Sequence, residues 1–264
     1  MSTVEARPDD YLAFCRAVAR LCGIDLTQYK RAQMERRIRG HARRRGADDL
    51  DGYLRLLRRD GAELDGFLDR ITINVSELWR NPEQWAALGR DVVPELARAG
   101  RIRIWSAGCS NGAEAYTALA VCRDAAPDVG VEVRGTDVDR RVLEQARHGA
   151  YPATAARSAP RAALARHFEP TADGGWRAGP ALRAGARFDQ GDLLRMAVPR
   201  AAFDLVLCRN TVIYFTGPVR DALHARLATA LRPGGHLLVG ATERLADPAA
   251  AGVEPVAPFL YRRR

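Results

Sequence analysis

Small and acidic residues follow two neighbouring apolar runs in a pattern that favours a nucleoside ligand. The run from Ile104 leads into Ser-Ala-Gly-Cys-Ser-Asn-Gly at residues 106–112, centred on Gly108, before helix-forming residues begin. Small residues at a strand-to-helix turn admit a ligand close to the backbone, and the helix N-terminus offers free N–H groups. By itself, this run of small residues would be equally consistent with a tight turn that binds no ligand. Asp137 ends the next apolar run, 29 residues after Gly108, where a carboxylate can accept both hydroxyls of a ribose.

The charge next to this turn narrows the class of nucleoside. Glu114 stands two residues after Gly112, and the turn has neither the G-x-G-x-x-G spacing nor a P-loop lysine. A carboxylate repels phosphate but suits a cation, and S-adenosylmethionine carries a sulfonium, an ammonium and a ribose without a phosphate. Glu114 could instead serve as a helix cap, since acidic residues are favoured in the first turn. We expect no metal, because the histidines and cysteines show no ligand spacing.

Two later segments end in polar residues at positions expected for ligand contacts. Asp192 follows a predicted third strand at 186–188, and its carboxylate can accept from an adenine amino group. Asn210 follows the apolar run 203–208, where a core strand would stay apolar. Ligands of parallel sheets bind at the carboxyl ends of the strands, so both residues fall on the expected edge.

The elements that must position these residues differ along the chain. Apolar residues recur at three and four spacing through the first hundred residues, with Gly23, Gly46 and Gly61 as expected helix stops. From residue 101 short strand-like runs (102–107, 131–135, 203–208, 236–239) alternate with helical stretches (114–124, 140–148, 219–231), which predicts a parallel α/β sheet covered on both faces. Residues 150–190 interrupt this alternation with four prolines and a turn at 173–175, and we expect a small inserted hairpin.

Composition and charge indicate a folded protein of the cytoplasm. Of 264 residues, 47% are hydrophobic and 28% charged, and the five cysteines form no C-x-x-C pair. No apolar run approaches the roughly 20 residues of a membrane span. The net charge is +9, and the segment 30–45 holds eight basic residues against Glu35 alone. Such a patch favours an acidic partner, although charge runs are more often solvated.

Several longer phrases resemble one protein family. These are TINVSELWRNP (72–82), IWSAGCSNGAEAY (104–116), GTDVD (135–139), FDLVLCRNTVIYF (203–215) and LRPGGHLLVGATERL (231–245). Together they resemble the chemotaxis receptor glutamate methyltransferases, the CheR family, and the first and fourth are the most specific. The resemblance implies a Rossmann-like class I methyltransferase sheet, a small all-helical N-terminal domain and an inserted antiparallel β-subdomain. We place these at 81–264, 1–80 and 150–190, respectively.

The resemblance also implies an activity and a set of site residues. The activity is S-adenosyl-L-methionine-dependent methylation of glutamate carboxylates on the cytoplasmic domain of methyl-accepting chemoreceptors, with S-adenosyl-L-homocysteine as product. The enzyme is expected to act as a monomer. Arg80 and Tyr214 are expected nearest the transferred methyl group, as catalytic residues. Cofactor contacts are expected from Asn74, Ser76, Arg80, Gly108, Glu114, Asp137, Asp192, Leu193, Arg209 and Asn210. The chain departs from the family pattern at Ser76, where Thr is commoner, at Ala113, where Glu is usual, and at Asp192, where Asn is usual.

The basic segment becomes a candidate docking face for such a substrate. On a helical wheel Met34, Ile38 and Ala42 form a stripe that we expect to be buried. The arginines expected on the other side are Arg36, Arg37, Arg39, Arg43 and Arg44. Two other classes stay open, a methyltransferase acting on RNA or a small molecule and a non-catalytic cofactor sensor. The phrase 72–82 and the insertion favour the receptor enzyme, and we expect no nucleic-acid partner and no membrane insertion.

Overall fold

The computed structural model describes residues 9–72 and 76–264 and divides the chain into two units. Unit 1 comprises residues up to Ile73 together with Tyr214–Gly217, and unit 2 comprises Asn74–Ile213 and Pro218–Arg264. The sequence placed the domain boundary after residue 80, whereas the contacts divide the chain at residue 73. In the described residues no helix has both the length and the apolar character needed to cross a membrane.

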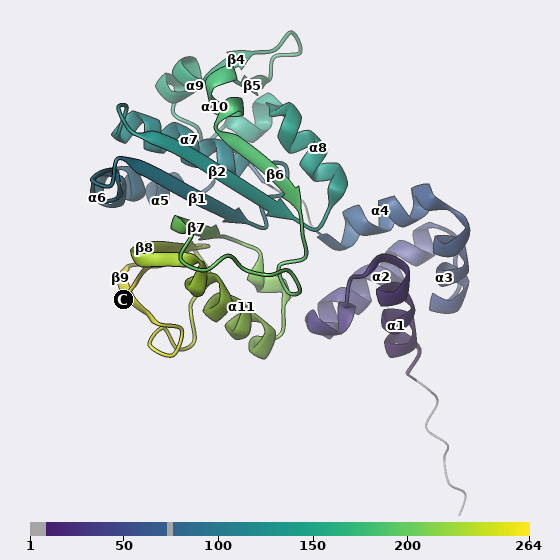
Figure 1. Ribbon diagram of the computed structural model, residues 1–264. Coiled ribbons are helices and arrows are strands. Elements are labelled where there is room, and N and C mark those ends of the chain that lie inside the picture. Colours follow the sequence, from purple (N-terminus) through teal and green to yellow (C-terminus); the bar gives the residue numbers. More distant parts are fainter. Residues whose placement is uncertain (1–8, 73–75) are drawn as a thin grey trace, which may run out of the picture. The chain divides into compact units, whose positions relative to one another are not determined.

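Unit 1 is a small helical domain whose helices end where the sequence provides caps. Its elements are α1 (Asp10–Cys22), η1 (Leu26–Gln28), α2 (Arg31–Arg44), α3 (Leu50–Arg59) and α4 (Gly61–Thr72) (Figure 1). The Asp9 carboxylate accepts from Leu12 N–H at the start of α1, and Gly23 ends that helix with a left-handed φ of 81°. Gly61 is not a stop: it is the first residue of α4.

The core of unit 1 is aromatic and contains one buried acid. The rings of Phe14, Tyr53 and Phe67 lie 5.9–6.2 Å apart between centroids. Glu63 is 3% exposed, and it accepts from the Tyr53 hydroxyl at 2.9 Å and pairs with Arg45. These bonds satisfy a carboxylate that would be costly to bury alone.

A short segment from the second half of the chain belongs to unit 1. Lys30 N–H donates to the Tyr214 carbonyl at 2.9 Å, and Thr216 N–H donates to the Gln28 carbonyl at 3.0 Å. Tyr29 and Phe215 form an antiparallel bridge with their ring centroids 5.0 Å apart. The residues around Tyr214 are therefore held by the helical unit, although the chain reaches them from the sheet.

Unit 2 is built on a seven-stranded sheet in the order β6-β2-β1-β7-β8-β10-β9. The strands are β1 (Arg101–Ala107), β2 (Gly130–Asp137), β6 (Ala186–Gln190), β7 (Phe203–Cys208), β8 (Leu231–Val239), β9 (Val253–Ala257) and β10 (Leu260–Arg263). β10 runs antiparallel to β8 and to β9, so the sheet is mixed and the expectation of a parallel sheet was wrong at this edge. The sequence pattern does not predict β9, because Pro255 and the exposed residues of this strand conceal the alternation.

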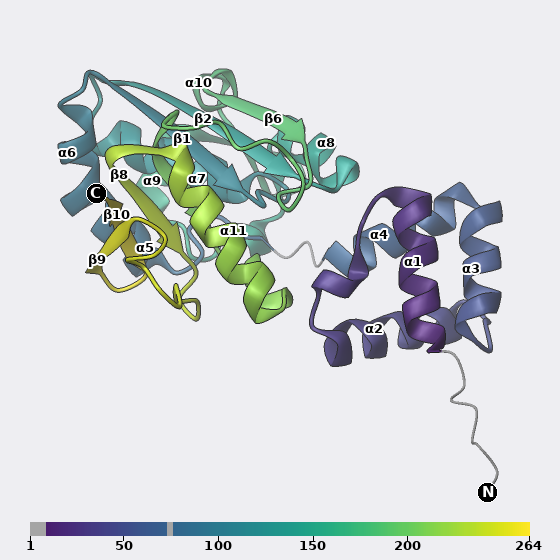
Figure 2. The ribbon, with the colours of Figure 1, turned by 60° about the horizontal axis from the view of Figure 1, so that its bottom comes forward.

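Helices cover both faces of this sheet, as predicted. α7 (Ala113–Ala125) and α8 (Arg140–His148) lie on one face, and α11 (Gly217–Ala230) lies on the other (Figures 1 and 2). The chain enters the sheet through α5 (Pro82–Ala87), a π-helical turn at Leu88–Val92 and α6 (Val93–Ala97). The short 3₁₀ turn η4 (Val212–Tyr214) follows β7.

The interruption after α8 forms a second, three-stranded antiparallel sheet. Its strands are β3 (Ala150–Tyr151), β4 (Phe168–Pro170) and β5 (Trp176–Ala178), in the order β3-β5-β4. The short helices η3 (Ala153–Ala156), α9 (Arg161–His167) and α10 (Pro180–Ala184) accompany it. The inserted sheet thus ends at residue 178, and residues 186–190 of the predicted insertion belong to the main sheet as β6.

Candidate active site

The turn between β1 and α7 is closed by the neighbouring strand. Gly108 N–H and Cys109 N–H both donate to the Thr136 carbonyl, at 2.8 and 3.0 Å. Gly108 has a φ of +82°, and a Cβ at this position would clash with the Thr211 side chain. Both the backbone conformation and the packing therefore require glycine. Ser110 also has positive φ, at 49°.

Asp137 is fixed at the end of β2 by the same turn. Ser110 N–H donates to its Oδ2 at 2.8 Å, and Asp139 N–H donates to its Oδ1 at 3.0 Å. The residue is only 8% exposed. Burial raises the pKa of Asp137, and the two backbone donors oppose that rise. Each carboxylate oxygen keeps a second lone pair, which suits it to accept from ligand hydroxyls.

Glu114 lies in the first turn of α7 but does not act as its cap. The Ser106 hydroxyl donates to Glu114 Oε1 at 2.7 Å, and Arg209 Nη1 lies 3.4 Å from its Oε2. Ala113 N–H in the same turn is bonded by Asn111 Oδ1 instead. Burial raises the pKa of the Glu114 carboxyl, and the Arg209 charge acts against this rise. The geometry therefore does not support the capping interpretation, and a contact between Glu114 and a ligand stays a prediction.

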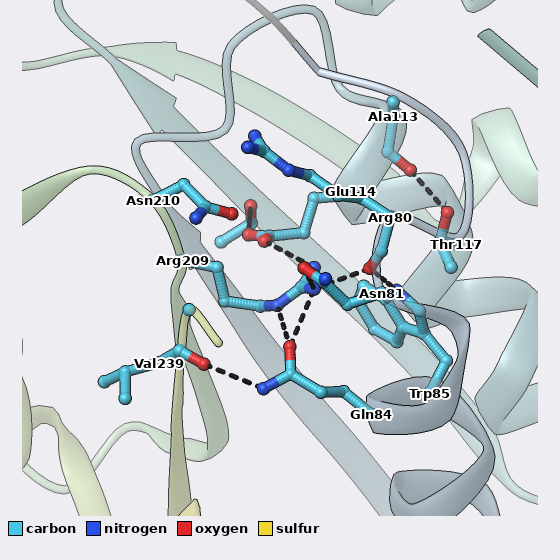
Figure 3. A network of polar contacts seen from close by, with 12 residues as sticks. Arg80, Asn81, Gln84, Trp85, Ala113, Glu114, Thr117, Arg209, Asn210 and Val239 are labelled. Carbon is cyan, nitrogen blue, oxygen red and sulfur yellow. Dashed lines mark hydrogen bonds and ion pairs between the residues drawn. The ribbon is translucent and has the colours of Figure 1, made fainter. Parts of the chain in front are cut away.

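Arg209 is buried at the end of β7 with its donors directed at protein groups. Its side chain is 2% exposed, and its guanidinium donates to the Arg80 carbonyl at 2.6 Å, to Asn81 Oδ1 at 3.3 Å and to Gln84 Oε1 at 2.8 Å (Figure 3). The guanidinium carbon lies 4.8 Å from the Trp85 ring centroid. A direct contact between this side chain and a cofactor stays a prediction, because the bonds described for its guanidinium go to protein groups in α5, in α7 and in the turn before α5.

That turn is strained at the residues on both sides of Arg80. Trp79 and Asn81, on either side of Arg80, have φ of 54° and 58°. Non-glycine residues in this region cost of order 1–3 kcal/mol each and persist where the surroundings hold them. Trp85 Nε1 and Arg209 both donate to the Arg80 carbonyl, which holds the turn. In Figure 3 the Arg80 side chain extends past Glu114.

Asn210 and Glu243 complete the polar cluster, and Glu243 is not among the site residues predicted from the sequence. Asn210 has a φ of 58°, and its N–H donates to Glu243 Oε2 at 2.8 Å. Gly240 N–H donates to the same oxygen at 2.6 Å. Glu243 is 3% exposed, and burial raises its pKa. The only signal was the acid in the phrase 231–245, which reads equally well as a surface residue after a strand.

Asp192 and Leu193 follow β6 at the same edge of the sheet. Gly191 N–H donates to the Asp137 carbonyl at 2.9 Å, which joins the ends of β2 and β6. Asp192 Oδ1 accepts from Leu194 N–H at 2.9 Å. The structure thus brings Gly108, Glu114, Asp137, Asp192, Leu193, Arg209 and Asn210 to the carboxyl ends of neighbouring strands.

The remaining predicted site residues lie elsewhere or outside the description. Asn74 is outside the described residues. Ser76 is partly exposed in the segment leading to Arg80. Tyr214 groups with the helical unit, where its ring centroid lies 6.0 Å from the Arg37 guanidinium carbon.

The arginines of α2 divide into two kinds, although the predicted buried stripe of Met34, Ile38 and Ala42 is confirmed. Arg39 pairs with Glu35 and Asp10 at 2.8 Å each, and Arg37 is half-buried. Arg36, Arg43 and Arg44 are exposed. We call these three the exposed arginines of α2.

Comparison with known proteins identifies the family. The chain matches the model "CheR methyltransferase, SAM binding domain" over residues 74–255 and the model "CheR methyltransferase, all-alpha domain" over residues 9–72. The chain belongs to the CheR methyltransferase family. It is 33% identical over 254 residues to the chemotaxis protein methyltransferase of Listeria innocua, covering 96% of each chain. It is 30% identical over 247 residues to chemotaxis protein methyltransferase 1 of Pseudomonas aeruginosa, covering 89% of this chain and 90% of that one.

The resemblance noted in the sequence is thereby confirmed, and S-adenosylmethionine is the cofactor of this CheR-family enzyme. The cluster fits that cofactor. Among the buried side-chain atoms that have no hydrogen-bond partner in the described part of the chain, three belong to this cluster: Ser110 Oγ, Asn210 Oδ1 and Glu243 Oε1. Buried polar atoms are normally bonded, so unpaired ones beside Asp137 and Glu114 indicate a place for a polar ligand. Acceptors predominate, as a cationic ligand with ribose hydroxyls requires.

Proposed function

We propose that this CheR-family enzyme esterifies glutamate side chains on the cytoplasmic helices of chemoreceptors, and that it does so in the cytoplasm. The relatives named chemotaxis protein methyltransferase match nearly the whole chain, the helical unit included. The observation that carries the proposal is the strained Arg80 turn, which is tied through Arg209 to the acid expected to bind the cofactor. The residue proposed to bind the substrate carboxylate is thus joined, through its backbone carbonyl, to the cluster proposed to bind the cofactor.

We assign the cofactor groups by charge. Glu114 would hold the ammonium of the methionine part, Asp137 the two ribose hydroxyls, and Asp192 with Leu193 the adenine. Asn210 Oδ1, which is buried and unpaired in the described residues, would accept a further ligand hydrogen. When bound, S-adenosylmethionine supplies an electrophilic methyl group on its sulfonium and is left as S-adenosylhomocysteine.

The chain's own contribution to the reaction is positioning. A glutamate carboxylate with an ordinary pKa near 4.3 is already ionised at neutral pH, so no general base is needed. Arg80 would hold that carboxylate, because its planar guanidinium binds both oxygens in a fixed geometry. Holding the oxygen in line with the methyl–sulfur bond can supply several kcal/mol of the barrier.

The assay that tests the proposal uses the chemistry of the product. The enzyme is incubated with cofactor labelled in the methyl group and with receptor cytoplasmic fragments. Glutamyl methyl esters release labelled methanol in base, whereas methylated bases or amines do not. Base-stable label, or label transferred to RNA and not to receptor, would contradict the proposal. Cofactor binding without any transfer would favour the sensor module instead.

Arg80→Lys tests the carboxylate-binding role. Lysine keeps the charge but loses the two-pronged donor geometry. We expect kcat to fall by at least tenfold while the Kd for S-adenosylhomocysteine, measured by calorimetry, changes less. Full kcat at saturating receptor would show that Arg80 only shapes the turn.

We further propose that the exposed arginines of α2 dock the acidic receptor helices. Attraction between exposed charges is screened within about 8 Å at physiological salt. Replacing Arg36 and Arg43 with Glu should therefore raise the receptor KM sharply at low salt and leave the cofactor Kd unchanged. Replacing Arg58 and Arg59 with Glu is the control, because these arginines are exposed on α3 of the same unit. This double variant makes the same change in net charge at a different place. Equal effects of the two double variants would mean that only net charge matters.

A further inference from the structure

The segment after β6 crosses to β7 as a compact turn without a helix. Asp192 organises its first residues, because its carbonyl accepts from Arg195 N–H at 3.0 Å and Met196 N–H at 2.8 Å. Its carboxylate Oδ1 accepts from Leu194 N–H at 2.9 Å. The carbonyls of Leu193, Leu194 and Met196 instead accept hydrogen bonds from outside the turn.

A single guanidinium from another element donates hydrogen bonds to all three carbonyls. Arg226, on α11, donates from Nη1 to the Leu193 carbonyl at 3.0 Å and to the Leu194 carbonyl at 2.8 Å. Its Nη2 donates to the Met196 carbonyl at 2.5 Å. Hydrogen bonds from a charged donor are roughly twice as strong as neutral ones. α11 thus holds the turn through three hydrogen bonds from Arg226.

The other attachment lies one residue before the turn. Gly191 N–H donates to the carbonyl of Asp137, the residue proposed to bind the ribose. The backbone of 191–196 is therefore fixed at its start by β2 and along its length by Arg226. This arrangement sets the separation between the Asp137 and Asp192 carboxylates, which must match the separation of ribose and adenine amino group in one ligand.

We propose that Arg226 is a positioning residue that sets the enzyme's selectivity for the adenine base. The proposal rests on the assignment above of Asp192 and Leu193 to the adenine. Without Arg226 the turn loses three bonds, and the Asp192 carboxylate is no longer aimed at one point. Selectivity for a base that presents an amino group there would then fall.

A control variant at a matched residue distinguishes the proposed positioning role of Arg226 from a purely structural role. Arg263, on β10, donates from Nη1 to three carbonyls near the end of the same helix, those of Ala228, Thr229 and Leu231. Its bonds match those of Arg226 in number and kind, but they touch none of the proposed cofactor residues. Arg263→Met therefore reports the cost of loosening α11 alone.

The experiment measures binding of two ligands by calorimetry. S-adenosyl-L-homocysteine presents an amino group at the base, whereas S-inosyl-L-homocysteine presents a carbonyl oxygen that repels a carboxylate. For Arg226→Met we expect the Kd of the first ligand to rise about tenfold, the equivalent of one charge-assisted hydrogen bond. The preference for it over the inosyl ligand should shrink by a similar factor. Arg263→Met should keep the preference, even if its thermal stability falls as much.

Two outcomes would overturn the proposal and can be told apart. If Asp192→Ala keeps the full preference, the adenine assignment is wrong and the positioning role falls with it. If Asp192→Ala loses the preference but folded Arg226→Met keeps it, the assignment stands and Arg226 is only structural. Should Arg226→Met fail to fold, Arg226→Lys carries the test, since an ammonium can serve some but not all of the three carbonyls, and a reduced preference is again expected.

Discussion

Replacing Arg209 with Met should destabilise unit 2 because a buried acid and a strained turn lose their shared donor. The Arg209 and Glu114 side chains are 2% and 11% exposed, and their charged atoms lie 3.4 Å apart. Removing one partner of a buried pair costs about 3–5 kcal/mol. The pair distance is long and Ser106 still donates to Glu114, so we expect the lower end, about 3 kcal/mol of unfolding free energy.

The loss of unfolding free energy in Arg209→Met should increase as the pH rises. Burial already raises the pKa of Glu114 above its ordinary value, and Arg209 is the main group opposing that rise. A carboxyl whose pKa is higher in the folded state binds more protons when folded, so stability falls as pH rises from the unfolded toward the folded pKa. Without Arg209 the folded pKa moves higher and that interval widens. The deficit of Arg209→Met relative to the wild type should therefore be largest at about pH 8 and smaller at about pH 5.5.

Urea unfolding followed by tryptophan fluorescence measures this loss of unfolding free energy in unit 2. All four tryptophans (Trp79, Trp85, Trp105 and Trp176) belong to unit 2, so the signal does not mix the two units. In a Glu114→Gln background the cost of Arg209→Met should lose its pH dependence, since the titrating group is gone. A deficit below about 1 kcal/mol, or one equal at both pH values in the Glu114 protein, would refute the reasoning.

Two further changes test the turn and the strand end that it contacts. Asp137→Ala should weaken S-adenosylhomocysteine binding at least tenfold in calorimetry, because a charged acceptor contributes roughly 1.5–3 kcal/mol, and unchanged affinity in the folded variant would remove the ribose assignment. Gly108→Ala should cost clearly more stability than Gly100→Ala in urea unfolding, because Gly100 shares the positive φ, at 72°, but a Cβ there meets nothing within 4 Å. Equal costs would mean that the clash with Thr211 is relieved by a small shift.

The sequence by itself determined the elements and the sites of strand-end chemistry. Helix and strand periods are local properties, so the buried stripe of α2, the strand that ends at Asp137 and the strand that precedes Asn210 could be predicted from spacing alone. The resemblance of the longer phrases to the CheR family added the activity and the receptor substrate. Local patterns do not predict the edge strand β9, because this strand has neither a continuous apolar run nor a clear alternation.

Only the tertiary structure decided what the polar side chains contact. Arg209 bonds to Gln84 across 125 residues of sequence, and Arg226 bonds to Leu193 across 33. No spacing distinguishes these arginines from exposed ones such as Arg43, because the distinction lies in which carbonyls and carboxylates the fold brings within 3 Å. Glu243 escaped notice for the same reason, since its backbone partners Asn210 and Gly240 come together only when β7 and β8 pair. Hydrogen bonds act over short distances in space, and the sequence orders residues along the chain only.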